Sequence, residues 1–204
     1  MASKKEPELK SEEDGQLQGR RYNCTRLFIR LLLSPNNGWR RLKADDVDPA
    51  DFERQLFYPL LALTALFQFF ILFYDPRVPI ADILRSAIVG FVSMFGAYFA
   101  TLAACSTLMP PKASEKAKRP FFRVFVSASL SVFDIGYLIS LVAPQLAIVL
   151  WLGIIYTLYI VCRGIKYLHL PHNERAAASV VGCILIVGLP TAIFALFTFL
   201  MPDA

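Results

Sequence analysis

The sequence predicts an all-α integral membrane protein, a bundle of five transmembrane helices behind an amphipathic cytoplasmic N-terminal region. Of its 204 residues 56% are hydrophobic and only 18% are charged, against about a quarter charged in soluble domains. Long uncharged runs recur along the chain. The first, LFYPLLALTALFQFFILFY, would cover about 28 Å as a helix, close to the ~30 Å hydrocarbon layer of a bilayer. The five expected spans are residues 56–74, 86–109, 124–142, 146–162 and 176–201.

The region before the spans divides into a polar tail and an amphipathic part. Residues 1–20 are rich in Lys, Glu, Ser and Gln. They cannot bury enough apolar surface to offset the entropy of ordering, so we expect disorder there. Residues 21–54 form the cytoplasmic or interfacial part. Within it, TRLFIRLLL (25–33) predicts a short amphipathic helix with Arg26 and Arg30 on one side. This helix is suited either to the membrane interface or to packing on the cytoplasmic ends of the spans.

Local signals then lead into the first span. SPNNGW (34–39) predicts a turn, and Trp39, in a basic stretch, is typical of an interfacial anchor. Asp48 is a suitable N-cap, and Pro49 fits the first helical position. We therefore expect a helix that begins at Pro49 and continues into the membrane, with a kink at Pro59 near the surface.

The second span is unusually rich in small side chains at four-residue spacing. Such residues let helices approach closely in lipid, so we expect this helix in the middle of the bundle. Their ridges would also permit a homodimer. One ridge comprises Ser93, Ala97 and Thr101, and the adjacent one Gly96, Ala100 and Ala104.

The remaining spans are joined by short polar segments. PPKASEKAKRPFFR (110–123) predicts a basic loop, residues 143–145 a tight turn, and LPHNER (170–175) a second polar loop. The fifth span contains Pro190, which predicts a kink. The chain is thus expected to cross the membrane repeatedly with little structure between the crossings.

The basic residues are distributed very unevenly across the predicted membrane. Of the 21 Lys and Arg residues, only Arg77 and Arg85 fall on the side opposite the N-terminal region. By the positive-inside rule the N-terminus is cytoplasmic and the C-terminus lies outside. The same distribution accounts for the pI near 9.1, so we reject nucleic acid as a partner. Membrane lipids and other membrane or cytoplasmic proteins are the partners to expect.

The sequence predicts neither an enzyme nor a cofactor or metal site. The four cysteines are Cys24, Cys105, Cys162 and Cys183. None forms a CxxC pair, which argues against structural disulfides and zinc sites. His169 and His172 stand three residues apart, but only Glu174 adds a further ligand nearby, too few for a metal centre. Phosphate-binding loops and hydrolase signatures are absent from the sequence.

One ionisable residue inside a span is the main candidate for a functional site. Asp134 is the only acidic residue within a predicted span, where a carboxylate costs roughly 2.5–3.5 kcal/mol to insert. It should therefore face the bundle interior, paired or protonated. Two interpretations stay open: a proton, ion or substrate site, or a structural hydrogen bond to a Tyr or Ser hydroxyl. Counting residues places Asp134 level with Tyr156 and Thr157. The candidate polar site comprises Asp134, Ser131, Tyr137, Tyr156 and Thr157.

Basic side chains at the cytoplasmic edge are candidates for contacts with anionic lipids or partner proteins. Arg163 and Lys166 end the fourth span and should extend toward lipid phosphates. Together with the basic loop before the third span they would also suit an anionic-lipid pocket. The full set is Arg26, Arg30, Arg40, Arg41, Lys118, Arg119, Arg123, Arg163 and Lys166.

Several stretches resemble a known family of five-span membrane proteins. LLLSPNNGWRRLK (31–43) and then YPLLALTAL (58–66) are similar to the Ser-Pro, Trp and Pro-Leu pattern around the first span of the Yip family, the Rab/Ypt-interacting proteins and their bacterial relatives. LYIVCRGIKYLHLPHNERAA (158–177) resembles the family's exit from the fourth span. The resemblance covers about residues 25–200. Because the long Pro/Gln/Gly-rich segment of eukaryotic members is missing, it implies a bacterial relative in an inner membrane.

The resemblance implies a non-enzymatic membrane interaction protein. Our first hypothesis is therefore a scaffold that organises membrane proteins or lipids through its basic cytoplasmic face. The alternative is a small transporter or lipid-translocating protein with a polar intramembrane path around Asp134. Eukaryotic members are linked to Rab-type GTPases, and a bacterial member would have a different partner.

Overall fold

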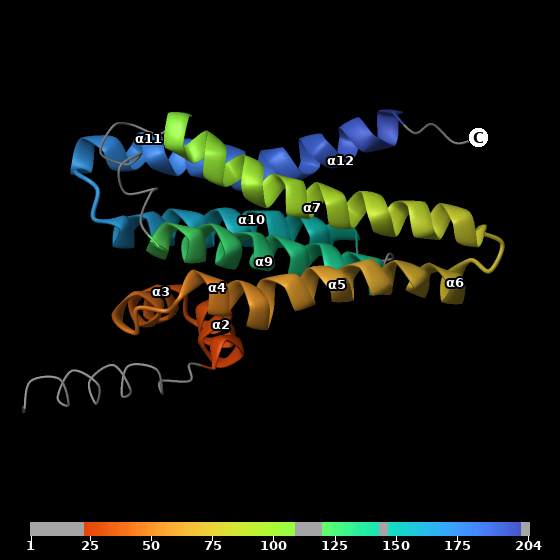
Figure 1. Cartoon of the computed structure of the whole chain (residues 1–204), viewed down its shortest axis with the longest axis horizontal. Helices are drawn as coiled ribbons and strands as arrows, with labels where there is room; N and C mark the ends of the chain where they lie inside the picture. Colours follow the sequence, from red (N-terminus) through yellow and green to blue (C-terminus); the bar gives the residue numbers. More distant parts are fainter. Residues whose placement is uncertain (1–22, 109–119, 143–146, 201–204) are drawn as a thin grey trace, which may run out of the picture.

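The computed structural model describes residues 23–108, 120–142 and 147–200, and every regular element among them is a helix. Five helical segments are long and apolar enough to cross a membrane, as the sequence predicts. They run side by side along the long axis of the molecule (Figure 1). The predicted disordered tail, the tight turn at 143–145, Lys118 and Arg119 lie outside the described residues.

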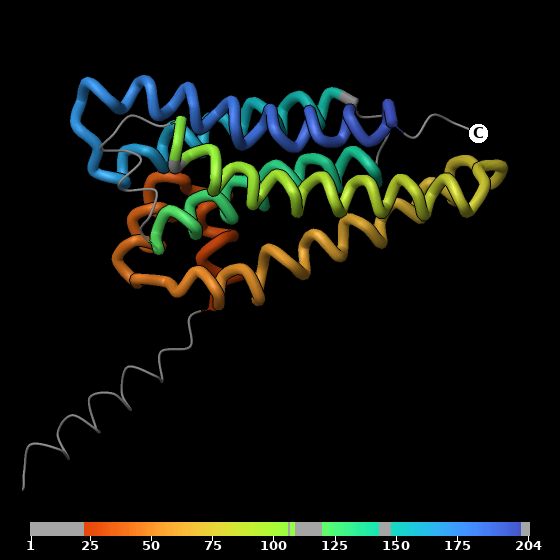
Figure 2. Tube along the Cα trace, turned by 45° about the horizontal axis from the view of Figure 1, so that its top comes forward, coloured from red at the N-terminus to blue at the C-terminus, as the bar shows by residue number. Residues whose placement is uncertain are grey.

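Two short helices precede the first span and pack against one end of the bundle. They are α2 (Cys24–Leu33) and α3 (Pro35–Ala44). The side-chain oxygen of Asn23 starts α2 by accepting a hydrogen bond from the Arg26 backbone N–H at 3.1 Å. We call α2 and α3 together the cap, and the end of the bundle where they lie the cap end; Figures 1 and 2 both place them there.

The segment before Trp39, predicted as a turn, is instead the beginning of α3. Pro35 occupies the first helical position, where its missing N–H costs nothing because that group would have no partner in a helix. These residue types are common both in turns and in the first turn of a helix. Here the helix forms because the residues that follow have an apolar face that packs on the rest of the protein. This face buries Gly38, Trp39 and Leu42.

The first span is a continuous helical run that begins at Pro49, as predicted. The Asp48 carboxylate caps it by accepting a hydrogen bond from the Ala50 N–H at 3.1 Å. In η1, a π-helical turn, the Tyr58 N–H donates to the Glu53 carbonyl. Pro59 follows at once, and the wider turn accommodates its missing N–H and its ring. The run comprises α4 (Pro49–Phe52), η1 (Glu53–Phe57), α5 (Tyr58–Phe67), η2 (Gln68–Phe70) and α6 (Ile71–Tyr74).

The second span, α7 (Ile80–Leu108), begins earlier than predicted. The Pro79 carbonyl accepts hydrogen bonds from the N–H groups of Asp82 and Ile83 at 3.0 and 3.3 Å. Asp82 and Arg85 interrupt the apolar run, so a span predicted from hydropathy begins after them and omits the first turns of α7. A charged residue ends an apolar run without ending a helix.

The last three spans also differ from the predicted limits by a few residues. α9 begins four residues before the expected start, and the predicted loop 170–175 is largely the first turn of α11, where the Pro171 carbonyl accepts from the Glu174 N–H at 3.0 Å. A second π-helical turn, η5, lies just before Pro190. The elements are α9 (Pro120–Val142), α10 (Ala147–Ile165), η4 (Lys166–Leu168), α11 (His172–Cys183), η5 (Ile184–Gly188) and α12 (Leu189–Leu200).

The central helix of the bundle is α9, and the prediction that the second span lies in the middle is wrong. Every residue of α9 from Val124 to Asp134 is buried, whereas α7 exposes Phe91, Phe95 and Phe99 along one side. α9 packs on α10, α5 and α7, and Figure 1 shows it between the last two. Its serines give α9 a thin profile that neighbours can approach from several directions.

The outer faces of the spans carry large exposed apolar side chains. Aliphatic and aromatic groups that face outward along a helix are costly in water and favourable in hydrocarbon. Together with the length of the five segments, they make this chain a multi-pass integral membrane protein. Examples from four spans are Phe73, Ile88, Trp151, Ile155, Leu196 and Phe199.

Candidate functional site

Asp134 lies on the central helix and is completely buried. Its Oδ2 accepts a hydrogen bond from the Thr64 hydroxyl of α5 at 3.1 Å. Its Oδ1 is buried and has no hydrogen-bond partner among the residues that the structure describes. The carboxyl group therefore faces the bundle interior, but its partner is a threonine of the first span and not the Tyr or Ser that we expected. Thr64 is the one hydroxyl residue of the stretch LLALTALF, and that is the signal that could have identified it.

The other four residues of the predicted polar site do not converge on Asp134. Gly136 and Gly153 pack closely, since a Cβ built on Gly136 would lie 3.2 Å from the Gly153 Cα. This antiparallel contact puts Asp134 near the level of Tyr156, close to the predicted register. The hydroxyls nevertheless bond elsewhere. The hydroxyls of Ser131 and Thr157 donate to carbonyls of their own helices, Ser127 O and Gly153 O, each at 2.8 Å. The Tyr156 hydroxyl donates to Leu32 O. The Tyr137 hydroxyl accepts from Gln68 Nε2 at 2.8 Å.

Two of these hydrogen bonds form a short polar ladder between α5 and the central helix. Thr64 and Gln68 are one turn apart on the first span, and their partners Asp134 and Tyr137 are one turn apart on α9. Interhelical hydrogen bonds of this kind contribute roughly 0.6–2 kcal/mol each in a membrane. The ladder fixes the rotation of the first span against the centre of the bundle.

A second polar cluster, which the sequence analysis missed, surrounds Glu53. This residue is only 3% exposed. Arg123 Nη2 lies 3.0 Å from both of its carboxylate oxygens, and the hydroxyls of Tyr98 and Tyr58 donate to the same group. The cluster joins the first, second and third spans near the cap end.

The contact with lipid or a partner that the sequence predicts for Arg123 stays a prediction, and in the structure this residue pairs with Glu53. It remains 48% exposed, so one edge of the group still faces outward. Glu53 could have been anticipated from the helical period, because it lies three and four residues before Leu56 and Phe57, both buried. The basic residue that pairs with Glu53 could not have been anticipated in the same way, because Arg123 is 70 residues away in the sequence.

Trp39 is not an interfacial anchor but the centre of the contact between the cap and the spans. It is fully buried, and its indole N–H donates to the Ile160 carbonyl at 3.1 Å. Its ring lies 5.3 Å from the ring of Phe125. A Cβ on Gly164 would come within 2.8 Å of the indole, so this glycine provides the space that the tryptophan occupies.

Further hydrogen bonds hold the cap in place. Lys43 Nζ donates to Tyr167 O at 2.7 Å, the Tyr167 hydroxyl donates to Asn36 O at 2.8 Å, and the Tyr156 hydroxyl donates to Leu32 O. The buried side of α2 consists of Cys24, Phe28 and Leu31. Of the two placements considered for residues 25–33, the structure therefore has this helix packed on the ends of the spans.

The predicted basic residues occupy the outer surface around the cap end. The Arg163 guanidinium lies 5.1 Å from the centre of the Tyr159 ring, a cation–π contact, and Arg40 donates to the Asn37 side chain at 3.2 Å. An anionic-lipid pocket with Lys118 and Arg119 involves residues outside the described ranges and stays a prediction. Among the described residues of the predicted basic set, those with exposed positions are Arg26, Arg30, Arg40, Arg41, Arg123 and Lys166.

The small residues of α7 pack within the chain. A Cβ on Gly96 would lie 3.9 Å from the Ile193 side chain of α12, and the Thr101 hydroxyl approaches Leu185 O at 3.5 Å. Gly96 and Thr101, one from each ridge, thus make contacts inside the bundle, and the homodimer that the ridges would permit stays a prediction. Ser93, Ala97 and Thr101 are buried, and Gly96, Ala100 and Ala104 are half-buried.

In the described part of the chain no group of three His, Cys, Asp or Glu side chains is placed to hold a metal ion. His169 adopts a left-handed conformation at the end of η4, and His172 begins α11. All four cysteines are free, although the sulfur atoms of Cys162 and Cys183 lie 3.8 Å apart.

The comparison with known families decides the identity of the chain. The model of the Yip1 domain matches residues 29–195, which is most of the sequence and contains the first four spans and most of the fifth. The chain belongs to the Yip1 family. No curated protein and no solved structure matches it in the same comparisons.

The matched region of the Yip1 domain includes most of the cap as well as the membrane bundle. Trp39, Glu53, Arg123 and Asp134 all lie within it. The cap is therefore part of the domain and not an appended segment, in agreement with its buried contacts to α10. Yip1 domains are in general non-enzymatic membrane proteins.

Proposed function

We propose that this Yip1 domain is a non-enzymatic membrane scaffold that binds an acidic cytoplasmic protein through the outer face of α2. The observation that carries the proposal is a mixed basic and apolar surface on a helix that is fixed to the bundle. Ile29 and Leu33 are 50% and 81% exposed, and Arg26 and Arg30 are exposed beside them. These four residues follow the spacing of one helical face, which we call the α2 face.

The cap contacts described above support this role. Trp39 and the three hydrogen bonds to α10 and η4 hold α2 in one position, so a partner would meet a preformed surface. Preformed surfaces lose little conformational entropy on binding. Exposed Leu33 would provide the apolar anchor, and the two arginines would favour carboxylate groups around it.

The proposed side of the membrane follows from charge. The cap end carries the exposed arginines, and the opposite end carries Arg77 and Arg85. The positive-inside rule therefore favours a cytoplasmic cap end, in the compartment where a soluble protein partner would be available.

Photocrosslinking in native membranes tests this proposal. A benzophenone amino acid at Leu33 should yield a discrete adduct with a protein. The double change Arg26→Glu and Arg30→Glu should reduce that adduct about tenfold, as expected from the loss of two exposed charge contacts. The same crosslinker at Asn37, exposed on α3, is the matched control and should not yield the adduct. Adducts with lipid alone at Leu33 would contradict a protein partner.

One observation favours the second candidate, a small transporter or lipid-translocating protein. Within the described ranges no group hydrogen-bonds to the buried Oδ1 of Asp134, and ionisable residues inside spans commonly mark ion and proton pathways. Flux and lipid-scrambling assays on reconstituted vesicles separate the two functions. A scaffold should show activity neither as the native chain nor as Asp134→Asn, whereas activity that the substitution abolishes would favour transport.

A further inference from the structure

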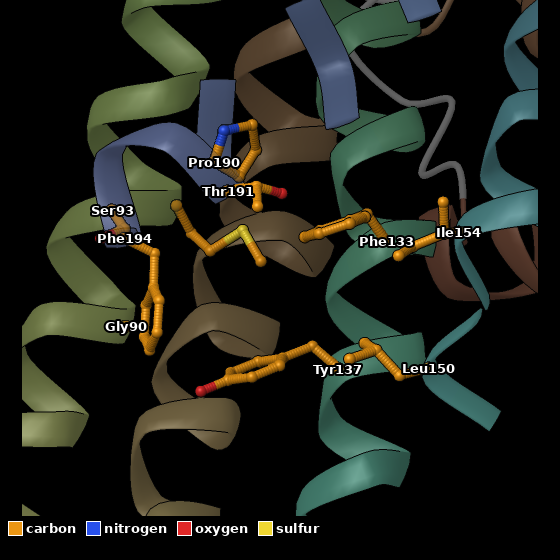
Figure 3. Close-up of a pocket in the computed structure, with 10 residues that line it drawn as sticks. Gly90, Ser93, Phe133, Tyr137, Leu150, Ile154, Pro190, Thr191 and Phe194 are labelled. Carbon is orange, nitrogen blue, oxygen red and sulfur yellow. The ribbon is translucent and has the colours of Figure 1, made fainter. Parts of the chain in front are cut away.

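A cavity of about 200 Å³ lies within the bundle, far from the cap. Its walls are almost entirely apolar and come from four helices, as Figure 3 shows for the converging side chains of α7, α9, α10 and α12. α9 packs closely on α10, and α12 packs closely on α7. The cavity occupies the space between these two helix pairs.

The cavity has a buried floor and an exposed mouth. Met94 and Phe133 form the floor and are 7% and 8% exposed. Thr191 and Phe194 are exposed at the mouth. Beside it α10 presents Trp151 and other large apolar side chains outward. The mouth therefore opens on a lipid-facing side of the bundle, and the molecules that reach it are those dissolved in the bilayer.

The depth of the cavity can be estimated from the helical rise. At 1.5 Å per residue, Phe133 and Tyr137 lie about 14 and 8 Å from the Val142 end of α9. The cavity thus occupies the half of the bilayer opposite the cap end. Water is scarce at this depth, and apolar cavities of about 150 Å³ stay dry and accept small apolar molecules.

Three hydroxyl residues line the cavity, and one of them, Thr191, already donates to Val187 O at 2.8 Å. The other two are Ser93 and Tyr137. Ser93 is 2% exposed, and its Oγ has no hydrogen-bond partner in the described part of the chain. The Tyr137 hydroxyl accepts from Gln68 Nε2 and keeps its own proton for donation. A Cβ built on Gly90, one turn before Ser93, would lie 4.0 Å from the Tyr137 oxygen, so both hydroxyls border the α7 side of the cavity.

We propose that this cavity binds one lipophilic molecule of the membrane that carries a carbonyl oxygen in its apolar body. The apolar walls would hold the hydrocarbon part, and the hydroxyls of Ser93 and Tyr137 would donate to the carbonyl. Such a ligand satisfies the buried hydroxyl donor of Ser93 and the half-buried one of Tyr137, which a plain hydrocarbon chain leaves unpaired. The inference is independent of the scaffold function, because the α2 face lies at the other end of the bundle.

Two photoreactive lipid-chain probes test the proposal on the protein reconstituted in bilayers. They share chain length and a terminal diazirine, and only one carries a mid-chain ketone. Mass spectrometry then maps the labelled residues. The ketone probe should label the floor residues Met94 and Phe133 more than the plain probe, by about tenfold, as expected for one or two buried hydrogen bonds. Both probes should label lipid-facing Trp151 and Ile155 equally, which serves as the internal control.

Substitutions of Ser93 identify the source of this preference. Ser93→Ala should remove most of the preference for the ketone probe, and Ser93→Phe should fill the cavity and abolish floor labelling by both probes. Ser86→Ala, exposed on the same helix, should change neither. Unchanged labelling at Trp151 reports that each variant is folded, and Ser93→Ala suffices where Ser93→Phe does not fold. Equal floor labelling by the two probes, or none at all, would overturn the proposal.

Discussion

Glu53 is a carboxylate at the junction of three spans, and its environment is asymmetric. Glu53 itself is 3% exposed, whereas its partner Arg123 keeps 48% of its side chain exposed. Loss of one partner therefore has different consequences for the other. An unpaired Arg123 can extend toward water or lipid phosphates, but an unpaired Glu53 stays buried with only tyrosine hydroxyls around it.

This asymmetry predicts unequal costs for the two single substitutions. Arg123→Met should lower the free energy of unfolding by about 3 kcal/mol, because it leaves a buried charge without its counter-ion. Glu53→Gln should cost about 1 kcal/mol, because the amide oxygen still accepts from Tyr98. Unfolding in a denaturing-detergent titration measures both. Arg54→Met, exposed on the adjacent residue, is the control and should stay within about 0.5 kcal/mol; equal costs at Glu53 and Arg123 would refute the argument.

Cys24 gives a pH-dependent prediction at the same scale. Burial raises the pKa of its thiol above the ordinary value of 9.0, and the nearby Asp51 carboxylate raises this pKa further. Since the thiolate is the reactive species, maleimide should modify Cys24 far more slowly in the folded protein than in the unfolded chain at pH 7–9. The folded state favours the protonated thiol, so this contribution to stability is complete below about pH 9 and decreases as pH rises above it.

Mass spectrometry of timed alkylation measures the rate. Thr25→Cys in a Cys24→Ala background places a thiol at the exposed neighbouring position and should react at the rate of a free thiol. Similar rates at positions 24 and 25 would show that α2 does not stay packed on the bundle.

At the scale of elements, two glycines control how closely the cap can approach its surroundings. A Cβ on Gly38 would lie 2.4 Å from the Leu31 Cα within the cap, and one on Gly164 would lie 2.8 Å from the Trp39 indole. The first contact is with backbone, which no rotamer change can relieve. The crossing of α2 and α3, and with it the position of the α2 face, therefore requires a residue without a side chain at position 38.

Gly38→Ala should accordingly disrupt the α2–α3 crossing and cost about 3 kcal/mol or more. Limited proteolysis should then cleave within the cap at sites that are protected in the native chain. Gly96→Ala is the matched control, because its Cβ would meet only a flexible side-chain tip at 3.9 Å. A Gly38→Ala protein as resistant to protease as the Gly96→Ala protein would contradict the close contact between α2 and α3.

The two π-helical turns are a second feature at this scale. η1 and η5 each end two residues before a proline, Pro59 or Pro190. The sequence predicts a kink at each proline. In the structure a wider π-helical turn precedes each proline, and this turn removes the clash of the proline ring with the carbonyl four residues back. The helix consequently continues through both positions.

At the scale of the whole molecule, the single span between the cap and the α6–α7 connection places these two parts on opposite sides of the membrane. We expect a cysteine at Asn37, in an otherwise cysteine-free chain, to react with an impermeant maleimide only from the cytoplasmic side. A cysteine at Arg77 should react only from the other side. Modification of both from the same side would exclude the proposed orientation and the first span itself.

The sequence by itself determined the class of protein, the number of spans and the start of the first helix at Pro49. These are local properties: each depends on the transfer of neighbouring residues into hydrocarbon or on a cap within one turn. The resemblance to the Yip family could also be recognised from the sequence alone, because it depends on short stretches at the ends of spans.

Only the tertiary structure decided which faces meet. It put Trp39 in the core with a partner 121 residues away, paired Asp134 with Thr64, and made α9 the central helix in place of α7. The physical reason is that lipid is as apolar as a helix interior. Hydropathy therefore distinguishes segments that enter the membrane from segments that stay in water. It does not distinguish the lipid-facing side of a span from its buried side. Which side is buried depends on steric fit and on a few hydrogen bonds between distant parts of the chain.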